Sequence, residues 1–186
     1  MTKSISKFIK DLCFLEKSEG NEFVLSSGEK SRYYIDIKSA NLRPAGNQIL
    51  SEYLYNVSLE FGEIDTIGAV VLGGCALAIG LSIYVYQHTG KAYNVVNIRK
   101  VPKDHGSTKK TIEQPFLDST NRRILIIEDV VTTGNSSIAA AYELEKENFN
   151  VAGILSVVDR RKEKLEMLDK YKFKALTTLE DIINAK

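Results

Sequence analysis

The chain has 186 residues, a formal net charge of +1, 44% hydrophobic residues and 26% charged residues. This length is near the usual size of one domain, and the composition excludes a disordered, collagen-like or low-complexity protein. A net charge so close to zero provides no overall positive field, which disfavours a nucleic-acid-binding module and a protein attracted to anionic membranes. We therefore expect a single domain over residues 1–186, with no nucleic-acid and no membrane partner.

The N-terminal segment and the two cysteines indicate a cytoplasmic protein. Charged residues interrupt the apolar ones in the first twenty positions, so no signal-peptide core is expected there. Cys13 and Cys75 are far apart and outside any C-x-x-C pattern, which argues against a disulfide framework or a zinc site. The apolar stretch from Ile67 to Tyr86 contains four glycines, so it is predicted to be a buried strand, a turn and a buried helix.

Residues 1–42 are predicted to form a small N-terminal hood made of a helix and a hairpin. Apolar residues at helical spacing from Ile5 to Leu15 predict an amphipathic helix that ends near Gly20. Two short runs rich in aromatic and β-branched residues, Glu22 to Leu25 and Arg32 to Lys38, predict a hairpin-like pair with a longer loop.

Residues 62–165 are predicted to form an α/β core with a doubly wound, mainly parallel sheet flanked by helices. Near-continuous apolar strands such as Ile124 to Ile127 are typical of a sheet covered on both faces, and alternation of strands with helices makes it parallel. Ligands of such a sheet bind beyond the carboxyl ends of its strands. The expected strands cover residues 66–72, 93–99, 123–128 and 151–159, and the expected helices cover 44–61, 76–88, 136–148 and 178–184.

Residues 100–121 form a long connection between two of these strands. A loop of this length inside a compact domain is usually functional or mobile. Two interpretations are open at this point: a solvated basic loop, or a mobile catalytic loop that closes over a polyanion. Its first part concentrates positive charge, with Arg99, Lys100, Lys103, Lys109 and Lys110 against the single acid Asp104, and with His105 and Gly106 among them.

The stretch RILIIEDVVTTGNSS, residues 123–137, carries the clearest chemical signal. An apolar strand ends in Glu128 and Asp129, and Thr132 to Ser137 then turn into a helix. Such a turn offers hydroxyls and free backbone amides at a helix N-terminus, which suit a phosphate. The sequence contains neither a Walker loop nor a dinucleotide fingerprint, and an ordinary strand-to-helix turn leaves the acid pair unexplained. The pattern indicates a ligand with a phosphate at one end and hydroxyls at the other, such as a phosphorylated ribose.

This stretch resembles the phosphoribosyl diphosphate (PRPP) binding motif of the type I phosphoribosyltransferases. Three further stretches resemble pieces of orotate phosphoribosyltransferases: FVLSSGEKSRYYIDIK (23–38) their N-terminal hairpin, NIRKVPKDHG (97–106) their catalytic loop, and VVDRR (157–161) a strand ending in Asp-Arg. These pieces occur in the family's order and cover most of the chain. The resemblance implies a type I phosphoribosyltransferase fold and transfer of the 5-phosphoribosyl group from PRPP to N1 of orotate in UMP biosynthesis.

The resemblance also implies roles for individual residues. Lys103, His105 and Asp129 would be catalytic, and Tyr34, Ile35, Thr132 and Arg160 would bind orotate. The implied PRPP-binding residues are Gly73, Gly74, Arg99, Lys100, Lys103, His105, Glu128, Asp129, Val130, Val131, Thr132, Thr133, Gly134, Asn135 and Ser136.

The family's cofactor and partners are implied in the same way. The reaction needs Mg²⁺, for which no direct protein ligand is assigned, and the enzyme is a homodimer in which the loop Arg99–Lys110 acts in the neighbouring subunit's site. An association with orotidine-monophosphate decarboxylase stays open. So do three alternatives: Gly73-Gly74 as a tight turn only, a phosphoribosyltransferase for another base, and a regulatory protein that senses PRPP without catalysis.

Overall fold

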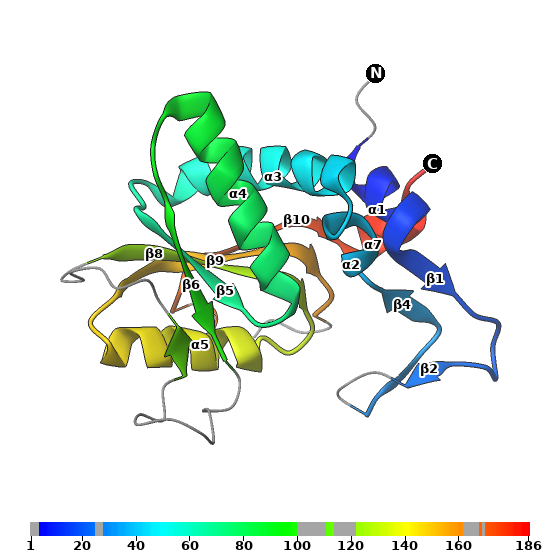
Figure 1. Ribbon diagram of the computed structural model, residues 1–186. Coiled ribbons are helices and arrows are strands. Elements are labelled where there is room, and N and C mark those ends of the chain that lie inside the picture. Colours follow the sequence, from blue (N-terminus) through cyan, green and yellow to red (C-terminus); the bar gives the residue numbers. More distant parts are fainter. Residues whose placement is uncertain (1–3, 25–27, 100–110, 114–121, 162–167, 169) are drawn as a thin grey trace.

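A six-stranded sheet forms the centre of the computed structural model, which describes residues 4–24, 28–99, 111–113, 122–161, 168 and 170–186 (Figure 1). Its strands, in spatial order, are β10 (Phe173–Thr178), β9 (Asn150–Asp159), β8 (Arg123–Val131), β5 (Thr66–Val70), β6 (Asn94–Ile98) and β7 (Ile112–Glu113). All neighbours are parallel except β6 and β7. The predicted mainly parallel α/β sheet is confirmed. The four central strands were expected, at residues 66–72, 93–99, 123–128 and 151–159. The outer strands β7 and β10 were not predicted.

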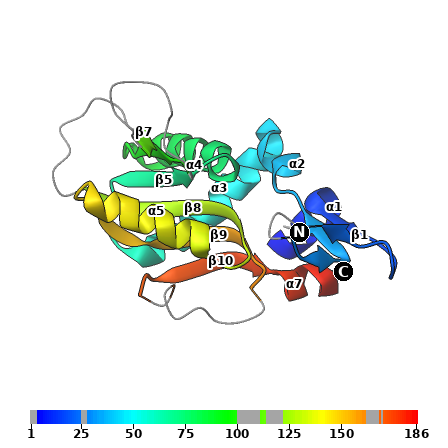
Figure 2. The same ribbon diagram turned by 90° about the horizontal axis from the view of Figure 1, so that it is seen from below.

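Helices cover both faces of the sheet. Helices α3 (Pro44–Ser58) and α4 (Gly73–Thr89) lie on one face and α5 (Asn135–Lys146) lies on the other (Figures 1 and 2). A short 3-10 helix (Leu59–Phe61) follows α3. In the described ranges no helix is long and apolar enough to cross a membrane.

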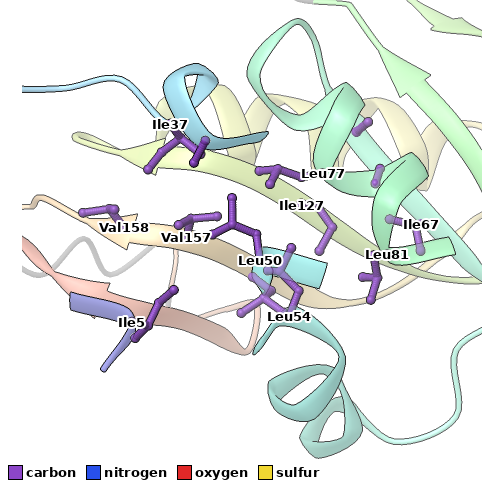
Figure 3. Packing of buried hydrophobic residues seen from close by; sticks show 14 of the residues in the cluster. Ile5, Ile37, Leu50, Leu54, Ile67, Leu77, Leu81, Ile127, Val157 and Val158 are labelled. Atoms are coloured by element: carbon purple, nitrogen blue, oxygen red, sulfur yellow. The ribbon is translucent and has the colours of Figure 1, made fainter. Parts of the chain in front are cut away.

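The apolar run of β8 fills two cores at once. Leu125 and Ile127 belong to the core under α3 and α4, whereas Ile124 and Ile126 belong to the core under α5. Successive side chains of a strand point to opposite faces, so a strand covered on both sides needs apolar residues at every position. Figure 3 shows Ile127 in the first of these cores, together with Leu50 and Leu54 of α3 and Leu77 and Leu81 of α4.

The N-terminal hood differs in detail from the expected helix and hairpin. Helix α1 (Ile5–Cys13) ends well before Gly20, because β1 (Phe14–Glu16) leaves it and pairs antiparallel with β4 (Tyr33–Ile35). The rings of Phe14 and Tyr33 stack at 5.6 Å between centroids. Strand β2 (Phe23–Val24) pairs with β3 (Lys30–Ser31) rather than with the residues that follow. The expected end of the helix and the expected pairing were therefore wrong.

The hood is fastened to the C-terminal end of the chain. The hydroxyls of Ser6 in α1 and Thr177 in β10 are 2.7 Å apart, and Lys10 Nζ donates to the carbonyls of Ile183 (2.7 Å) and Ala185 (2.8 Å). Helix α7 (Leu179–Asn184) begins with a capping box between Thr178 and Asp181. These contacts fix the hood beside the carboxyl end of the sheet, where Figure 1 shows α1 next to α7.

Candidate active site

A cavity of about 390 Å³ lies at the carboxyl ends of β5, β8 and β9. This is the edge of a parallel sheet where ligands are expected. The walls come from the hood, from the turn between β5 and α4, from the turn between β8 and α5, and from the end of β9. The lining residues are Val24, Tyr34, Ile35, Lys38, Val71, Leu72, Gly73, Glu128, Asp129, Val130, Val131, Thr132, Thr133, Gly134, Ser136, Ser137 and Arg160.

The last residues of β8 bring two carboxylates to this cavity. The strand runs on to Val131, three residues beyond its expected end, because it stays paired with β9. Glu128 is only 6% exposed, whereas Asp129 is half-buried and accepts a hydrogen bond from the amide of Val130 (2.9 Å). A Cβ atom on Gly73 would overlap the Asp129 carboxylate, so glycine at this position allows the carboxylate to lie against the turn before α4.

The turn between β8 and α5 has the geometry of an anion site. Gly134 adopts a left-handed conformation (φ 79°) at the start of α5, which glycine adopts without steric cost. The first amides of a helix have no intrahelical acceptor and carry partial positive charge. Thr132 and Thr133 are exposed and Ser137 is buried, so hydroxyls line the turn at several depths. A phosphate dianion fits these donors.

Arg160 brings a guanidinium to the cavity wall between the end of β8 and the hood. Its amide donates to Val131 O (2.8 Å), which places the residue beside the end of β8. Its Nη2 atom donates to Ser31 Oγ (2.7 Å) and to Tyr33 O (3.0 Å) in the hood. The neighbouring carboxylate of Asp159 pairs instead with Arg161, at 2.9 and 2.8 Å. Burial lowers the pKa of Arg160, which reflects the desolvated wall in which it lies.

Lys38 is a second cation on the cavity wall, and it was not singled out from the sequence. It begins the short helix α2 (Lys38–Asn41), and its Nζ atom lies 2.7 Å from Asp36 Oδ1. The hydrogen bond that Lys38 donates to Asp36, with the charges of Asp36 and Asp129, raises the pKa of Lys38. The sequence signal that could have indicated Lys38 was its position at the end of residues 23–38, the stretch that resembles the family's N-terminal hairpin. The other lining residues without a predicted role are Val24, Val71 and Leu72.

Most of the predicted site residues that the structure describes meet at this cavity. Three do not line it: Gly74, Asn135 and Arg99. A Cβ atom on Gly74 would lie 2.6 Å from Ile127 O, so this glycine allows close packing of α4 on β8. Arg99 pairs with Glu113 of β7 at 2.9 Å. Lys100, Lys103 and His105 lie outside the described residues.

The cavity fits a magnesium ion that arrives with a phosphorylated substrate. Glu128 and Asp129 are the carboxylates of its described lining, and no group of three or more His, Cys, Asp or Glu side chains placed to hold a metal occurs in the described ranges. Magnesium commonly takes one or two carboxylates and completes its shell with substrate phosphates and water.

Comparison with known proteins identifies the class to which this fold and cavity belong. Residues 40–185 match the phosphoribosyl transferase domain family, so the chain is a phosphoribosyltransferase by class. The orotate phosphoribosyltransferase of Tropheryma whipplei is 33% identical over 184 residues, covering 98% of this chain and 82% of that protein. That of Pyrococcus abyssi is 37% identical over 166 residues, covering 88% and 86%. The chain therefore belongs to the orotate phosphoribosyltransferase family, as its motifs predicted.

Solved structures confirm the fold. The orotate phosphoribosyltransferase of Aeropyrum pernix matches with a TM-score of 0.78 at 23% identity, covering 96% of each chain. That of Mycobacterium tuberculosis, solved in complex with PRPP, matches with a TM-score of 0.72 at 21% identity and the same coverage. An adenine phosphoribosyltransferase from Leishmania donovani also matches, with a TM-score of 0.63 at 13% identity, covering 97% of this chain and 82% of that one. The fold alone thus does not select the base.

Proposed function

We propose that this chain transfers the 5-phosphoribosyl group from PRPP to N1 of orotate and releases orotidine 5′-monophosphate and diphosphate. The observation that carries the proposal is that one cavity is lined by an acid pair, a phosphate-binding turn and an arginine. A phosphorylated ribose needs the first two, and a carboxylated base needs the third. Membership of the orotate phosphoribosyltransferase family supports the same reaction.

The two turns at the sheet edge bind different parts of PRPP. The amides and hydroxyls of residues 132–137 bind the 5-phosphate, since the start of α5 favours an anion. Glu128 and Asp129 accept hydrogen bonds from the ribose hydroxyls, because an ionised carboxylate can only accept. Gly73, whose backbone lies against the Asp129 carboxylate, begins α4 directly after the turn that faces the diphosphate.

Arg160 recognises the orotate carboxylate. Both of its described side-chain hydrogen bonds use Nη2, so a paired contact with a carboxylate, which needs Nη2 together with Nε or Nη1, exchanges Ser31 or Tyr33 for the ligand. A planar guanidinium donates two parallel hydrogen bonds to a carboxylate, which a lysine cannot reproduce. Tyr34 covers the ring of orotate. The ring of Phe23 packs against the ring of Tyr34, with 5.4 Å between their centroids. Ile35 and Thr132 complete the base pocket.

The protein stabilises a separation of charge. The bond between C1 of the ribose and the diphosphate breaks with both electrons going to diphosphate, N1 of orotate bonds to C1, and the N1 proton is released. Positive charge develops on the ribose beside the carboxylates of Glu128 and Asp129, and negative charge develops on diphosphate. Preorganised groups that face developing charge are usually the largest contribution to catalysis. Magnesium bound with PRPP would neutralise part of the diphosphate charge.

The reaction is tested by following orotate absorbance with PRPP and Mg²⁺, beside identical mixtures with adenine, hypoxanthine or uracil and beside one with a chelator. We expect loss of orotate only when the metal is present, with one diphosphate released for each orotate consumed. Turnover with another base in place of orotate would contradict the substrate. PRPP binding without turnover of any base would assign the chain to the regulatory class.

Replacement of Arg160 by alanine is expected to act on orotate rather than on PRPP. Hydrogen bonds to charged groups are worth enough to raise the KM for orotate about 10- to 100-fold. The KM for PRPP should change little, because the guanidinium of Arg160 bonds to the hood at Ser31 and Tyr33 rather than to residues 132–137. Arg160→Lys keeps the positive charge but cannot donate two parallel hydrogen bonds, so it should restore the affinity for orotate only in part. Equal effects on both KM values would remove Arg160 from the base pocket.

We also propose that the chain forms a homodimer through the outer face of α4. Ile79 and Ile83 are 50% and 52% exposed there, and Leu72, which also lines the active cavity, is 82% exposed. A groove of about 750 Å³ between α3 and α4 has Arg43 as the charged member of its described lining. Exposed apolar patches of this kind are typical of protein interfaces. A second copy on this face reaches the cavity rim at Leu72, which suits a shared site.

A further inference from the structure

PRPP carries phosphate groups at both ends, but few side-chain cations line the described part of the cavity. Among the described lining residues, Lys38 and Arg160 are the cations, and Glu128 and Asp129 are the carboxylates. Arg160 is tied to the hood through Ser31 and Tyr33, on the side proposed for orotate. The phosphate turn has its own backbone donors. Lys38 is therefore the described cation available to the diphosphate side, where Leu72 and Gly73 lie.

Contacts at both ends of α2 fix Lys38 relative to that side. Ile37, just before it, is fully buried. At the other end Asn41, which is 3% exposed, donates from Nδ2 to Gly73 O (3.3 Å). Asn47 of α3 donates to Asn41 O (3.0 Å) and to Ala76 O (2.9 Å), which joins α2, α3 and α4. The short helix that begins with Lys38 is thus held against the start of α4 at Gly73.

The ammonium group itself can change partners. Its ion pair with Asp36 is short (2.7 Å), but the two side chains are 50% and 30% exposed. Exposed ion pairs of this kind contribute about 0–1 kcal/mol, so exchanging the carboxylate for a phosphate oxygen costs little. Lys38 and Asp129 both line the cavity, and the charge of Asp129 contributes to the raised pKa of Lys38.

We infer that Lys38 is a further substrate-binding and catalytic residue, which donates a charge-assisted hydrogen bond from Nζ to the diphosphate of PRPP. This inference rests on the proposed function. Lys38 keeps its proton throughout: the electrons of the C1–O bond go to the departing diphosphate, and the ammonium stabilises the charge that collects there. Because Lys38 belongs to the hood, this donor is present in each subunit independently of residues 100–110.

The test compares the two halves of PRPP as separate probes. Lys38→Met removes the ammonium and keeps the apolar stem, Lys38→Arg keeps a cation, and Lys91→Met is a matched control on a lysine that is 61% exposed beyond the far end of α4. Calorimetric titration with inorganic diphosphate and Mg²⁺ is set beside titration with ribose 5-phosphate.

For Lys38→Met we expect diphosphate and PRPP to bind about 10-fold more weakly or worse and kcat to fall, with ribose 5-phosphate affinity unchanged. Lys38→Arg should recover most of the loss, and Lys91→Met should behave as the native protein.

Two results would overturn the inference while leaving the proposed function intact. One is native diphosphate affinity and kcat in Lys38→Met. The other is an equal loss of affinity for diphosphate and ribose 5-phosphate, which would mean a general disturbance of the cavity. Thermal unfolding of each variant checks that the fold is kept, and the arginine variant separates charge from packing. Failure of the native protein to bind PRPP at all would instead contradict the proposed function, and the inference with it.

Discussion

Replacing Lys103 by alanine is expected to lower kcat by about 100- to 1000-fold, the usual effect of removing one donor to developing negative charge. The described lining has two carboxylates against two cations, and PRPP adds several negative charges. Further cations are therefore needed when the diphosphate leaves. The strand that precedes the segment with Lys103 ends at the carboxyl edge of the sheet: Val71 donates from its amide to Ile98 O (3.1 Å) at the end of β6.

The measurement is kcat at saturating orotate and PRPP, with KM for each substrate. Lys110→Ala, a change of the same charge in the same segment, is the control and should stay within about threefold of the native rate, since the family resemblance assigns no substrate-binding role to Lys110. A Lys103→Ala protein with native kcat and only a raised KM for PRPP would mean that Lys103 binds the substrate equally before and during reaction. That outcome would contradict its catalytic role.

The core and much of the cavity could be predicted because both depend on local sequence. Ile124 to Ile127 form a buried strand by composition, and the side chains that follow must then emerge at the carboxyl edge of a parallel sheet. The acid pair and the turn at Gly134 are contiguous with that strand, so one stretch defines both the fold and the phosphate site. Arg160 follows by the same logic at the end of the next strand.

The hood and the outer strands could not be predicted because tertiary contacts decide them. Leu15 continues the helical spacing of α1, yet pairing with β4 ends the helix at Cys13. Strand β7 is only two residues long, and β10 is largely half-buried at an edge, so neither has a strong apolar pattern. Lys38 reaches the cavity through the contact between Asn41 and Gly73, residues 32 positions apart, which no spacing in the sequence reveals.

Asp129→Asn is expected to lower kcat/KM about 100-fold, with kcat carrying most of the loss. Asparagine keeps the size of the side chain, so it can occupy the space that Gly73 leaves for the carboxylate. It removes the negative charge that stabilises the ribose as C1 becomes positive, and it replaces one acceptor by a donor that faces the ribose hydroxyls. Asp11→Asn, which breaks an exposed ion pair with Lys7 on α1, is the matched control and should leave kcat unchanged. Native kcat in Asp129→Asn would contradict a catalytic role for this carboxylate.

The same variant tests whether two subunits share a site. If the segment carrying Lys103 acts in the neighbouring subunit, a heterodimer of Lys103→Ala and Asp129→Asn chains contains one cavity with both native residues and one with neither. Heterodimers isolated with two different affinity tags should then recover about half of the native kcat per dimer, because the two sites of a symmetric dimer are equivalent. If each subunit closes its own cavity, both sites of the heterodimer lack one residue and no activity returns. Recovery would also require the apolar face of α4 to join the chains, so Ile83→Asp in both chains should abolish it.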